Sequence, residues 1–243
     1  MHKSAWKDKA VHLVFIGAAS MSILIVVLIF LFLGKEAVPF AAKPGLAELL
    51  SSRWMPVSFQ KESFGLYPLI TGSLLVTFLA TSIAVPFGVC AAVYLSEVAN
   101  VTEREIFKPF IELLAGIPSV VLGFFGLIVL APIVKNIFGL QTGLTALTGA
   151  LLLALMAIPT IISISEDAIR GVPESYKQAS LALGASRLQT IWRVTVPAAL
   201  SGIVAAVMLG IGRVIGETMA VMMVTGNAAI MTASPFESVR TMT

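Results

Sequence analysis

The sequence predicts an all-α membrane protein that crosses the bilayer several times, and three observations support this fold class. Charged residues make up 12% of the chain, about half the share found in soluble domains. Hydrophobic residues make up 58%, and the mean hydropathy is +0.97. Uncharged runs recur along the chain, and they reach the roughly 20 residues that a helix needs to cross a bilayer.

Four of these runs predict one spanning helix each. The first is too long to be the apolar part of a cleaved signal, which has about 7–15 residues. Prolines inside or beside the runs are compatible with spanning helices, because neighbouring helices satisfy the carbonyls that proline leaves free. The four runs are Ala10–Gly34, Ser63–Ser96, Leu113–Val134 and Asn136–Ser165.

The fifth predicted span runs from Pro197 to about Thr225 as one long helix, and it contains Arg213 and Glu217. The short stretch RVIGE, which separates its two uncharged parts, is too short to turn outside the bilayer. A charge at mid-membrane costs about 2.5–3.5 kcal/mol on insertion scales, so both residues should face a cavity or a partner. Their i, i+4 spacing puts them on one helical face, where we expect them to pair.

The basic residues predict a cytoplasmic N-terminus, because loops on that side of a membrane carry more Lys and Arg. Nine basic residues then lie inside and five lie outside. Five spans leave the C-terminus outside, and we expect the chain to stop before a sixth helix. The expected domains are residues 1–65, with a stub, the first helix and an external loop, and residues 66–243, with a cytoplasmic loop at 166–193.

This cytoplasmic loop is predicted to form two short amphipathic helices joined at a glycine. Pro173 suits the start of the first helix, where its missing N–H costs nothing. Gly184 suits a left-handed stop, and Ser186 with Gln189 has the spacing of a capping box for the second helix. A fixed bend of this kind favours docking onto a partner. The alternative is a linker that lies among the lipid headgroups.

The second helix is expected to end at Val196-Pro197, because the residue before proline avoids the helical region. The loop as a whole resembles the cytoplasmic loop of ABC-importer permeases, whose pattern is E-A-A, three residues, G, nine residues and I-x-L-P. In that family the loop seats in a groove of the ATPase subunit. The matching residues are Gln178, Ala179, Ser180, Gly184, Val194, Val196 and Pro197, with glutamine, serine and two valines departing from the pattern.

Three further stretches resemble phosphate-importer permeases, namely YPLITGSLLVT, IELLAGIPSVVLGFFGL and GRVIGETMAV. The W-x-P at Trp54–Pro56 favours the PstC-type subunit. The resemblance implies a type I ABC-importer permease, a MetI-like helical bundle, with five of the six family helices present. It also implies a plasma (inner) membrane location and three partners: a PstA-type permease, a PstB-type ATPase dimer and a periplasmic or lipid-anchored PstS-type phosphate-binding protein.

The pair Arg213 and Glu217 is interpreted as part of the anion path. A guanidinium has planar, forked donors that suit phosphate oxygens, and Glu217 would neutralise it when the path is empty. The resemblance points the same way, since these residues match the charged pair that the family places in the path. The alternative is a structural ion pair that fixes this chain to its partner permease.

The sequence lacks the P-loop pattern GxxxxGK[ST] and any metal-binding or hydrolase motif, so we expect no enzyme activity and no cofactor in this chain. The net charge of +3 clusters at the ends of apolar runs, which argues against nucleic acid and for contact with membrane lipid. The charges of Ser96–Glu112 are interpreted as a solvated face. The alternatives to phosphate import are a permease for sulfate or molybdate and an ATP-independent secondary anion transporter.

Overall fold

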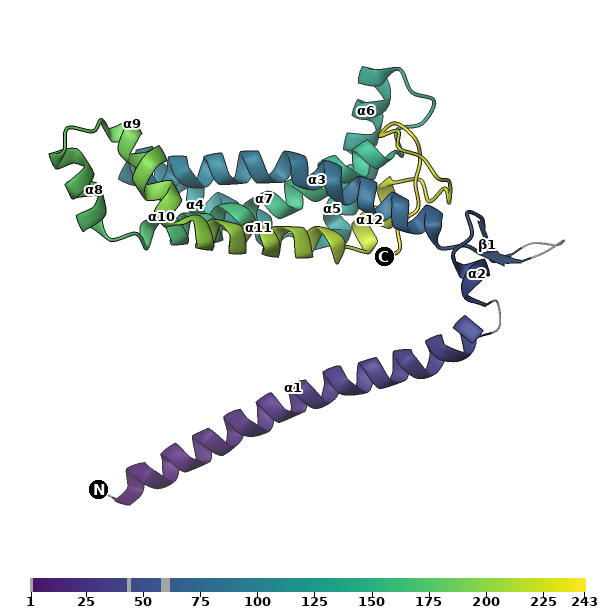
Figure 1. Ribbon diagram of the computed structural model, residues 1–243, viewed down its shortest axis with the longest axis horizontal. Coiled ribbons are helices and arrows are strands. Elements are labelled where there is room, and N and C mark those ends of the chain that lie inside the picture. Colours follow the sequence, from purple (N-terminus) through teal and green to yellow (C-terminus); the bar gives the residue numbers. More distant parts are fainter. Residues whose placement is uncertain (1, 43–44, 58–61) are drawn as a thin grey trace. The chain divides into compact units, whose positions relative to one another are not determined.

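The computed structural model describes residues 2–42, 45–57 and 62–243. The chain divides into two compact units, of which the first comprises Met1–Ser51 with Met55–Gly65 and the second comprises Ser52–Trp54 with Leu66–Thr243. Helices dominate both units (Figure 1). The predicted all-α class is therefore confirmed.

The first unit consists mainly of one long helix, α1 (His2–Ala42). Its segment Val11–Pro39 is long and apolar enough to span a membrane, and none of its most apolar window is buried within the protein. An apolar surface exposed all round a helix is stable only in lipid or against other proteins. A short helix α2 (Leu46–Leu49) follows, and the strands β1 (Trp54–Met55) and β2 (Ser63–Phe64) pair in a small sheet.

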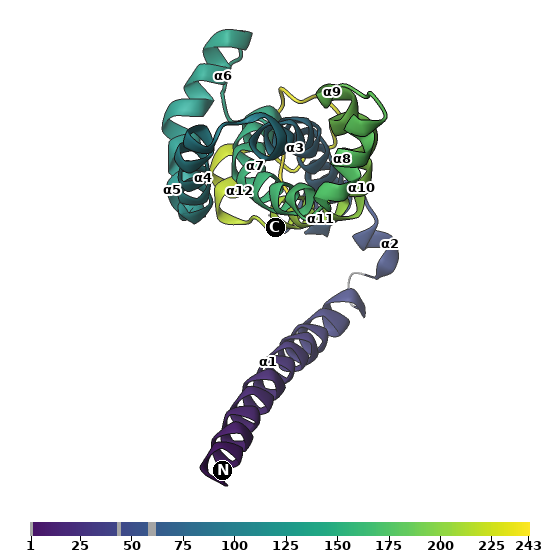
Figure 2. The same ribbon diagram turned by 90° about the vertical axis from the view of Figure 1, so that its left-hand side faces the viewer.

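The second unit is a bundle with α7 (Ala146–Arg170) at its centre. The helices α3 (Tyr67–Val93) and α11 (Leu200–Ile215) lie along α7 over much of its length, as Figures 1 and 2 both show. More than half of the most apolar window of α7 is buried, compared with about a fifth of that in the α3 span. The helix that the others surround thus forms most of the core.

Ile161 of α7 fills space that two glycines leave open. A Cβ atom on Gly210 of α11 would lie 2.6 Å from Cγ1 of Ile161, and one on Gly88 of α3 would lie 2.8 Å from its Cγ2. Small residues let membrane helices approach closely enough for dispersion contacts to hold them together. The three helices are therefore packed at a common point around one isoleucine.

Between α3 and α7 the chain forms one more helix, α4 (Val101–Gly116), and then a further apolar span. The helix α3 continues into a π turn, η1 (Tyr94–Val98), and α4 follows it. After a break at Ile117-Pro118, a further span, Ser119–Phe138, is formed by three elements. These are α5 (Ser119–Phe125), the π turn η2 (Gly126–Leu130) and α6 (Ala131–Phe138).

Two short helices project from the end of the bundle where α7 finishes (Figure 1). They are α8 (Glu174–Ala182) and α9 (Arg187–Thr190), and α9 continues through the π turn η3 (Ile191–Thr195) into α10 (Val196–Ala198). The chain then bends by 68° into α11. At the other end of the bundle, α12 (Met219–Val224) packs on α5.

The segment after α12 runs back over this second end of the bundle without forming a helix. The Val239 amide donates to the carbonyl of Thr225 (2.9 Å), and the Leu147 amide donates to the carbonyl of Pro235 (2.8 Å). The Met242 amide donates to Oγ of Ser73 on α3 (2.8 Å). This segment therefore closes the end of the bundle over α3 and α7.

The first four predicted spans are confirmed as helical segments long and apolar enough to cross a membrane, although their limits shift. The third begins at Ser119 instead of Leu113, because Pro118 breaks the helix. The fifth prediction, one long helix from Pro197 to Thr225, is wrong. In the described residues this region is a bent pair, Arg187–Ala198 with Leu200–Ile215, followed by a separate α12.

Candidate functional site

Arg213 lies in the last turn of α11 and reaches across to two other helices. Its Nη1 donates to the hydroxyl of Thr160 on α7 (3.1 Å), and its Nη2 is 3.4 Å from the carbonyl oxygen of Ala115. Ala115 belongs to the last turn of α4, just before the break at Ile117-Pro118. The half-buried guanidinium thus sits where α4, α7 and α11 meet inside the bundle.

The expected ion pair between Arg213 and Glu217 is absent from the ion pairs of the described residues. The i, i+4 geometry requires a continuous helix, whereas α11 ends at Ile215 and α12 begins at Met219. The Glu217 carboxylate accepts from the backbone N–H of Ala220 (3.2 Å) and thereby caps α12. The prediction that the two residues pair is therefore wrong.

The positive charge of Arg213 is consequently balanced only by neutral acceptors within the described part of the chain. A hydroxyl and a carbonyl orient the guanidinium but do not cancel its charge. Within a membrane such a charge marks a pathway or faces a partner by default. The arrangement leaves donors of the guanidinium fork free to bind an anion.

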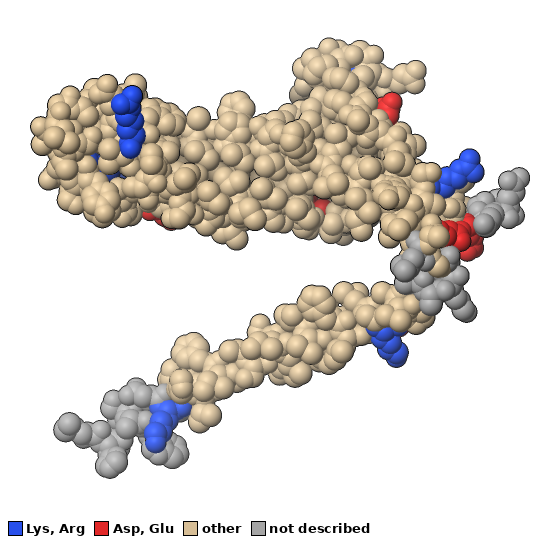
Figure 3. Space-filling model, viewed as in Figure 1, with Lys and Arg blue, Asp and Glu red and all other residues tan. Residues whose placement is uncertain are grey.

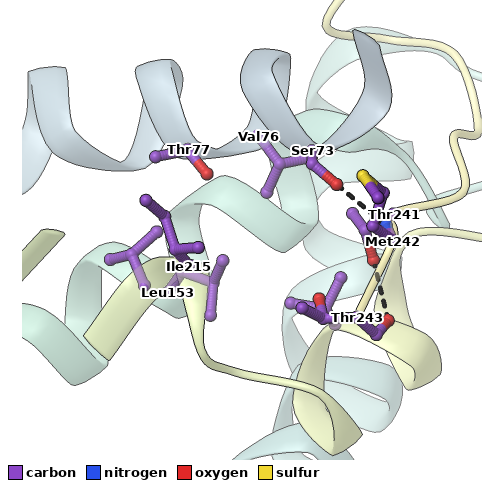
Figure 4. Close-up of a pocket in the computed structure, with 10 residues that line it drawn as sticks. Ser73, Val76, Thr77, Leu153, Ile215, Thr241, Met242 and Thr243 are labelled. Carbon is purple, nitrogen blue, oxygen red and sulfur yellow. Dashed lines mark hydrogen bonds between the residues drawn. The ribbon is translucent and has the colours of Figure 1, made fainter. Parts of the chain in front are cut away.

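A small cavity of about 120 Å³ lies beside the end of α11 and is distinct from the site of Arg213. Figure 4 shows Ser73 and Thr77 of α3 facing Ile215 and the segment Thr241–Thr243 across it. The Ser73 hydroxyl is occupied by the Met242 amide. Neither Arg213 nor Glu217 lines this cavity, so it is not the predicted anion site.

The predicted bend between the two projecting helices is confirmed. Gly184 has φ +84°, in the left-handed region. The Gly184 amide donates to the carbonyl of Leu181 (2.9 Å) and the Ala185 amide to that of Ser180 (3.2 Å), which together form a Schellman motif. Because α8 ends in this fixed turn, the loop has a defined shape.

The predicted capping box also forms at the start of α9. The Ser186 amide donates to Oε1 of Gln189 (2.9 Å), and the Gln189 amide donates to the Ser186 hydroxyl (3.3 Å). Gln178, Ala179 and Gly184 are exposed, whereas Ser180, Val194 and Val196 are half-buried. The first part of the loop pattern thus faces outward, and the two valines face the bundle.

The helix does not end at Val196-Pro197 as the sequence predicts. It passes through the π turn η3 and ends at Ala198. Val196 has φ −63° and ψ −46°, in the helical region that a residue before proline usually avoids. The wider π turn is the local adjustment that lets the helix accept Pro197.

Sequence reasoning missed a charged cluster around Glu166 at the end of α7 where α8 follows. This carboxylate is 1% exposed and contacts Arg104 (2.6 Å), Lys108 (3.3 Å) and Arg170 (3.7 Å). Arg104 and Lys108 belong to α4, so the expectation of a solvated face over Ser96–Glu112 is wrong for these two residues. An acid directly after an uncharged run was the one available signal.

Charged residues lie at both ends of the bundle on the face seen in Figure 3. On the face seen in Figure 3, the surface between these ends is almost entirely uncharged. Such a band, with charge at both rims, is typical of a protein that crosses a membrane several times.

Residues 84–240 match the family described as the binding-protein-dependent transport system inner membrane component, which is more than half of the chain. The chain belongs to this family. It is a multi-pass plasma membrane permease of the ABC-importer type and not an ATPase subunit. The MetI-like bundle expected from the resemblance is therefore confirmed.

Three related permeases are similar to this chain over most of its length. It is 41% identical to the probable ABC transporter permease protein YqgH of Bacillus subtilis, over 89% of this chain and 71% of that protein. It is 36% identical to the phosphate transport system permease protein PstC of Mesorhizobium japonicum, over 79% of this chain and 64% of that protein. It is 35% identical to the PstC protein of Pasteurella multocida, over 76% of this chain and 62% of that protein. The permease thus spans less than two thirds of these two PstC proteins.

A solved structure supports the fold of the permease. A chain of the MetNI methionine ABC transporter, captured in inward-facing conformations, aligns with a TM-score of 0.50 and 24% sequence identity. The alignment covers 63% of the permease and 68% of that chain. At this identity the likeness concerns the helical architecture alone.

Proposed function

We propose that the chain is the PstC-type permease subunit of an ATP-driven importer of inorganic phosphate. The identity of 35–36% to proteins named as PstC phosphate permeases is the main support. The single structural observation that carries the proposal is the set of partners around the Arg213 side chain. Its guanidinium lies inside the bundle with only neutral acceptors among the described residues.

In this proposal Arg213 meets the anion in transit. A forked, permanently charged donor recognises the oxygens of phosphate better than a point charge does. Glu217 lies in the break between α11 and α12, four residues further on. Because the Glu217 carboxylate accepts from the Ala220 amide and does not pair with Arg213, the charge of the guanidinium stays available to the anion.

Residues 66–243 act as the permease domain in this scheme, with residues 1–65 as an added membrane anchor. The loop 166–193 faces the cytoplasm, and so does the N-terminus. The side chains of Tyr176, Leu183 and Leu188 are exposed at the projecting end, with Leu183 90% exposed. These apolar side chains suit a protein groove better than water.

The groove belongs to a PstB-type ATPase dimer in this proposal. A PstA-type permease completes the membrane part, and a PstS-type protein delivers phosphate from outside. ATP-driven closure of the ATPases would move α8 and α9 and thereby switch the helices between outward and inward access. This chain contributes the path and the loop, and the ATPase contributes the energy.

Uptake of labelled phosphate into proteoliposomes tests the proposal. The vesicles contain the full-length gene product with its co-expressed partners, with ATP present or absent and sulfate as competitor. Uptake that requires ATP and resists sulfate supports the proposal. ATP-dependent uptake of sulfate in place of phosphate would contradict the proposed substrate but not the proposed architecture. Uptake that does not depend on ATP would contradict the importer mechanism.

A further inference from the structure

The helix α8 is attached to the bundle by polar contacts. It has nine residues, and none of them is buried. Its apolar side chains Tyr176 and Leu181 are 55% and 46% exposed. Apolar packing therefore contributes little to the position of α8. Its side-chain polar contacts determine which parts of the bundle move together with it.

The strongest of these contacts is an ion pair between Lys177 of α8 and Glu97. The Lys177 ammonium lies 2.6 Å from Oε1 of Glu97, and the two side chains are only 17% and 10% exposed. Lys177 has a second carboxylate nearby, that of Glu174, at 3.8 Å and 68% exposed. A short, largely buried pair orients both groups far more firmly than a long exposed one does.

Glu97 belongs to η1, the π turn at the end of α3, and this turn is fixed to the start of α4. The Tyr94 hydroxyl donates to Oε2 of Glu103 (3.1 Å), and the Asn100 amide donates to the same oxygen (3.0 Å). A displacement of Glu97 therefore acts on α3 and on α4 together. The ion pair joins α8 to residues 80 positions earlier in the chain.

A second contact joins α8 to the helix that follows it. The hydroxyls of Ser180 and Thr190 are 2.9 Å apart, and Thr190 is 4% exposed. Thr190 directly precedes η3, the π turn that leads to α10 and α11. One of these contacts of α8 thus ends in η1, where the chain leaves α3, and the other ends directly before η3, where the chain approaches α11.

We propose that Lys177 is a positioning residue that transmits movement of α8 to α3 and α4 through Glu97. This inference rests on the proposed function, because it assigns α8 to the ATPase contact. The Lys177–Glu97 pair acts as a rigid link between that contact and the spanning helices. Without it, the ATPases move α8 while α3 and α4 lag behind.

A matched pair of substitutions in the assembled transporter tests the link. Glu97→Gln removes the close partner of Lys177, and Glu174→Gln removes the distant one by the same chemical change. The quantity measured is phosphate taken up per ATP hydrolysed in proteoliposomes. We expect Glu97→Gln to lower this ratio by about 10-fold or more, as the loss of a hydrogen bond between charged groups allows, and Glu174→Gln to leave it unchanged.

The double variant Glu97→Lys with Lys177→Glu distinguishes the loss of this ion pair from a simple folding defect. Recovery of the ratio in the double variant supports the link, because the pair is restored with its charges reversed. An unchanged ratio in Glu97→Gln, or equal loss of uptake and hydrolysis in every variant, overturns it. A parent transporter that takes up phosphate without ATP refutes the proposed function instead, so the two failures are distinguishable.

Discussion

Arg104 and Glu166 join α4 to α7 through a contact of 2.6 Å across 62 residues of sequence. The carboxylate is 1% exposed and the arginine side chain is 23% exposed. Lys108 approaches the other carboxylate oxygen to 3.3 Å. The position of α4 against α7 thus depends on one buried acid with basic partners on the neighbouring helix.

Arg104→Met is expected to destabilise the protein by about 1.5–3 kcal/mol, the contribution of hydrogen bonds to a charged group. The buried carboxylate loses its closest partner, and Lys108 compensates only in part. Thermal unfolding of the purified transporter in detergent measures the effect. Glu105→Gln, at the exposed neighbouring position, is the control and should leave the melting temperature unchanged. Equal melting temperatures for both variants would contradict the structural role of Arg104.

Arg213→Gln in the assembled transporter is expected to abolish most phosphate uptake. Glutamine retains hydrogen-bonding capacity near Thr160 but removes the charge that attracts the anion. Thr160→Val tests the positioning contact alone and should lower uptake less, because the charge remains. Normal uptake by Arg213→Gln would exclude the path role and favour a structural contact with the partner permease.

Gly184→Ala is expected to weaken the projecting bend by about 1–2 kcal/mol, the cost of a left-handed conformation for a residue with a Cβ. A Cβ at Gly184 would meet no atom within 4 Å, so the effect is conformational and not steric. Gly184→Asn should cost less, because asparagine tolerates this conformation. Co-purification of the ATPase with each variant measures the change. Identical losses for alanine and asparagine would point to a contact of the glycine with its partner.

Gly210→Ala is expected to destabilise the bundle by about 1–3 kcal/mol through overpacking. The new methyl group would lie 2.6 Å from Cγ1 of Ile161, so α11 must move away from α7. Combining it with Ile161→Ala, which removes both Cγ1 and Cδ1, should cost less than the sum of the two single substitutions. A double-mutant cycle of melting temperatures gives the coupling. Strict additivity of the two substitutions would show that these residues do not share one space.

Local patterns in the sequence predict the local features of this structure well. The left-handed Gly184 and the capping box of Ser186 with Gln189 depend on neighbours within a few residues, and both form. Four spans follow from hydropathy alone. These features need no knowledge of which helix packs on which.

The features that the sequence did not reveal depend on distant parts of the chain. Glu166 accepts a hydrogen bond from Arg104, 62 residues earlier in the sequence. Arg213 donates to the carbonyl of Ala115, 98 residues earlier. The helical break after Ile215 removed the pairing of Arg213 with Glu217 that their spacing predicts. Gly216 and Thr218, the caps on either side of this break, are residue types that favour helix ends, but glycine is also common inside membrane helices.

The three π turns in the described part of the chain bear on how it tolerates changes of length. Each of Tyr94–Val98, Gly126–Leu130 and Ile191–Thr195 holds one residue more than the equivalent α-helical turn. An extra residue in a regular α-helix would rotate everything beyond it by about 100°. A π turn absorbs that residue locally, so both flanks keep their faces. These three turns are therefore the places where helices of related proteins can gain or lose a single residue while the surfaces packed on either side stay in register.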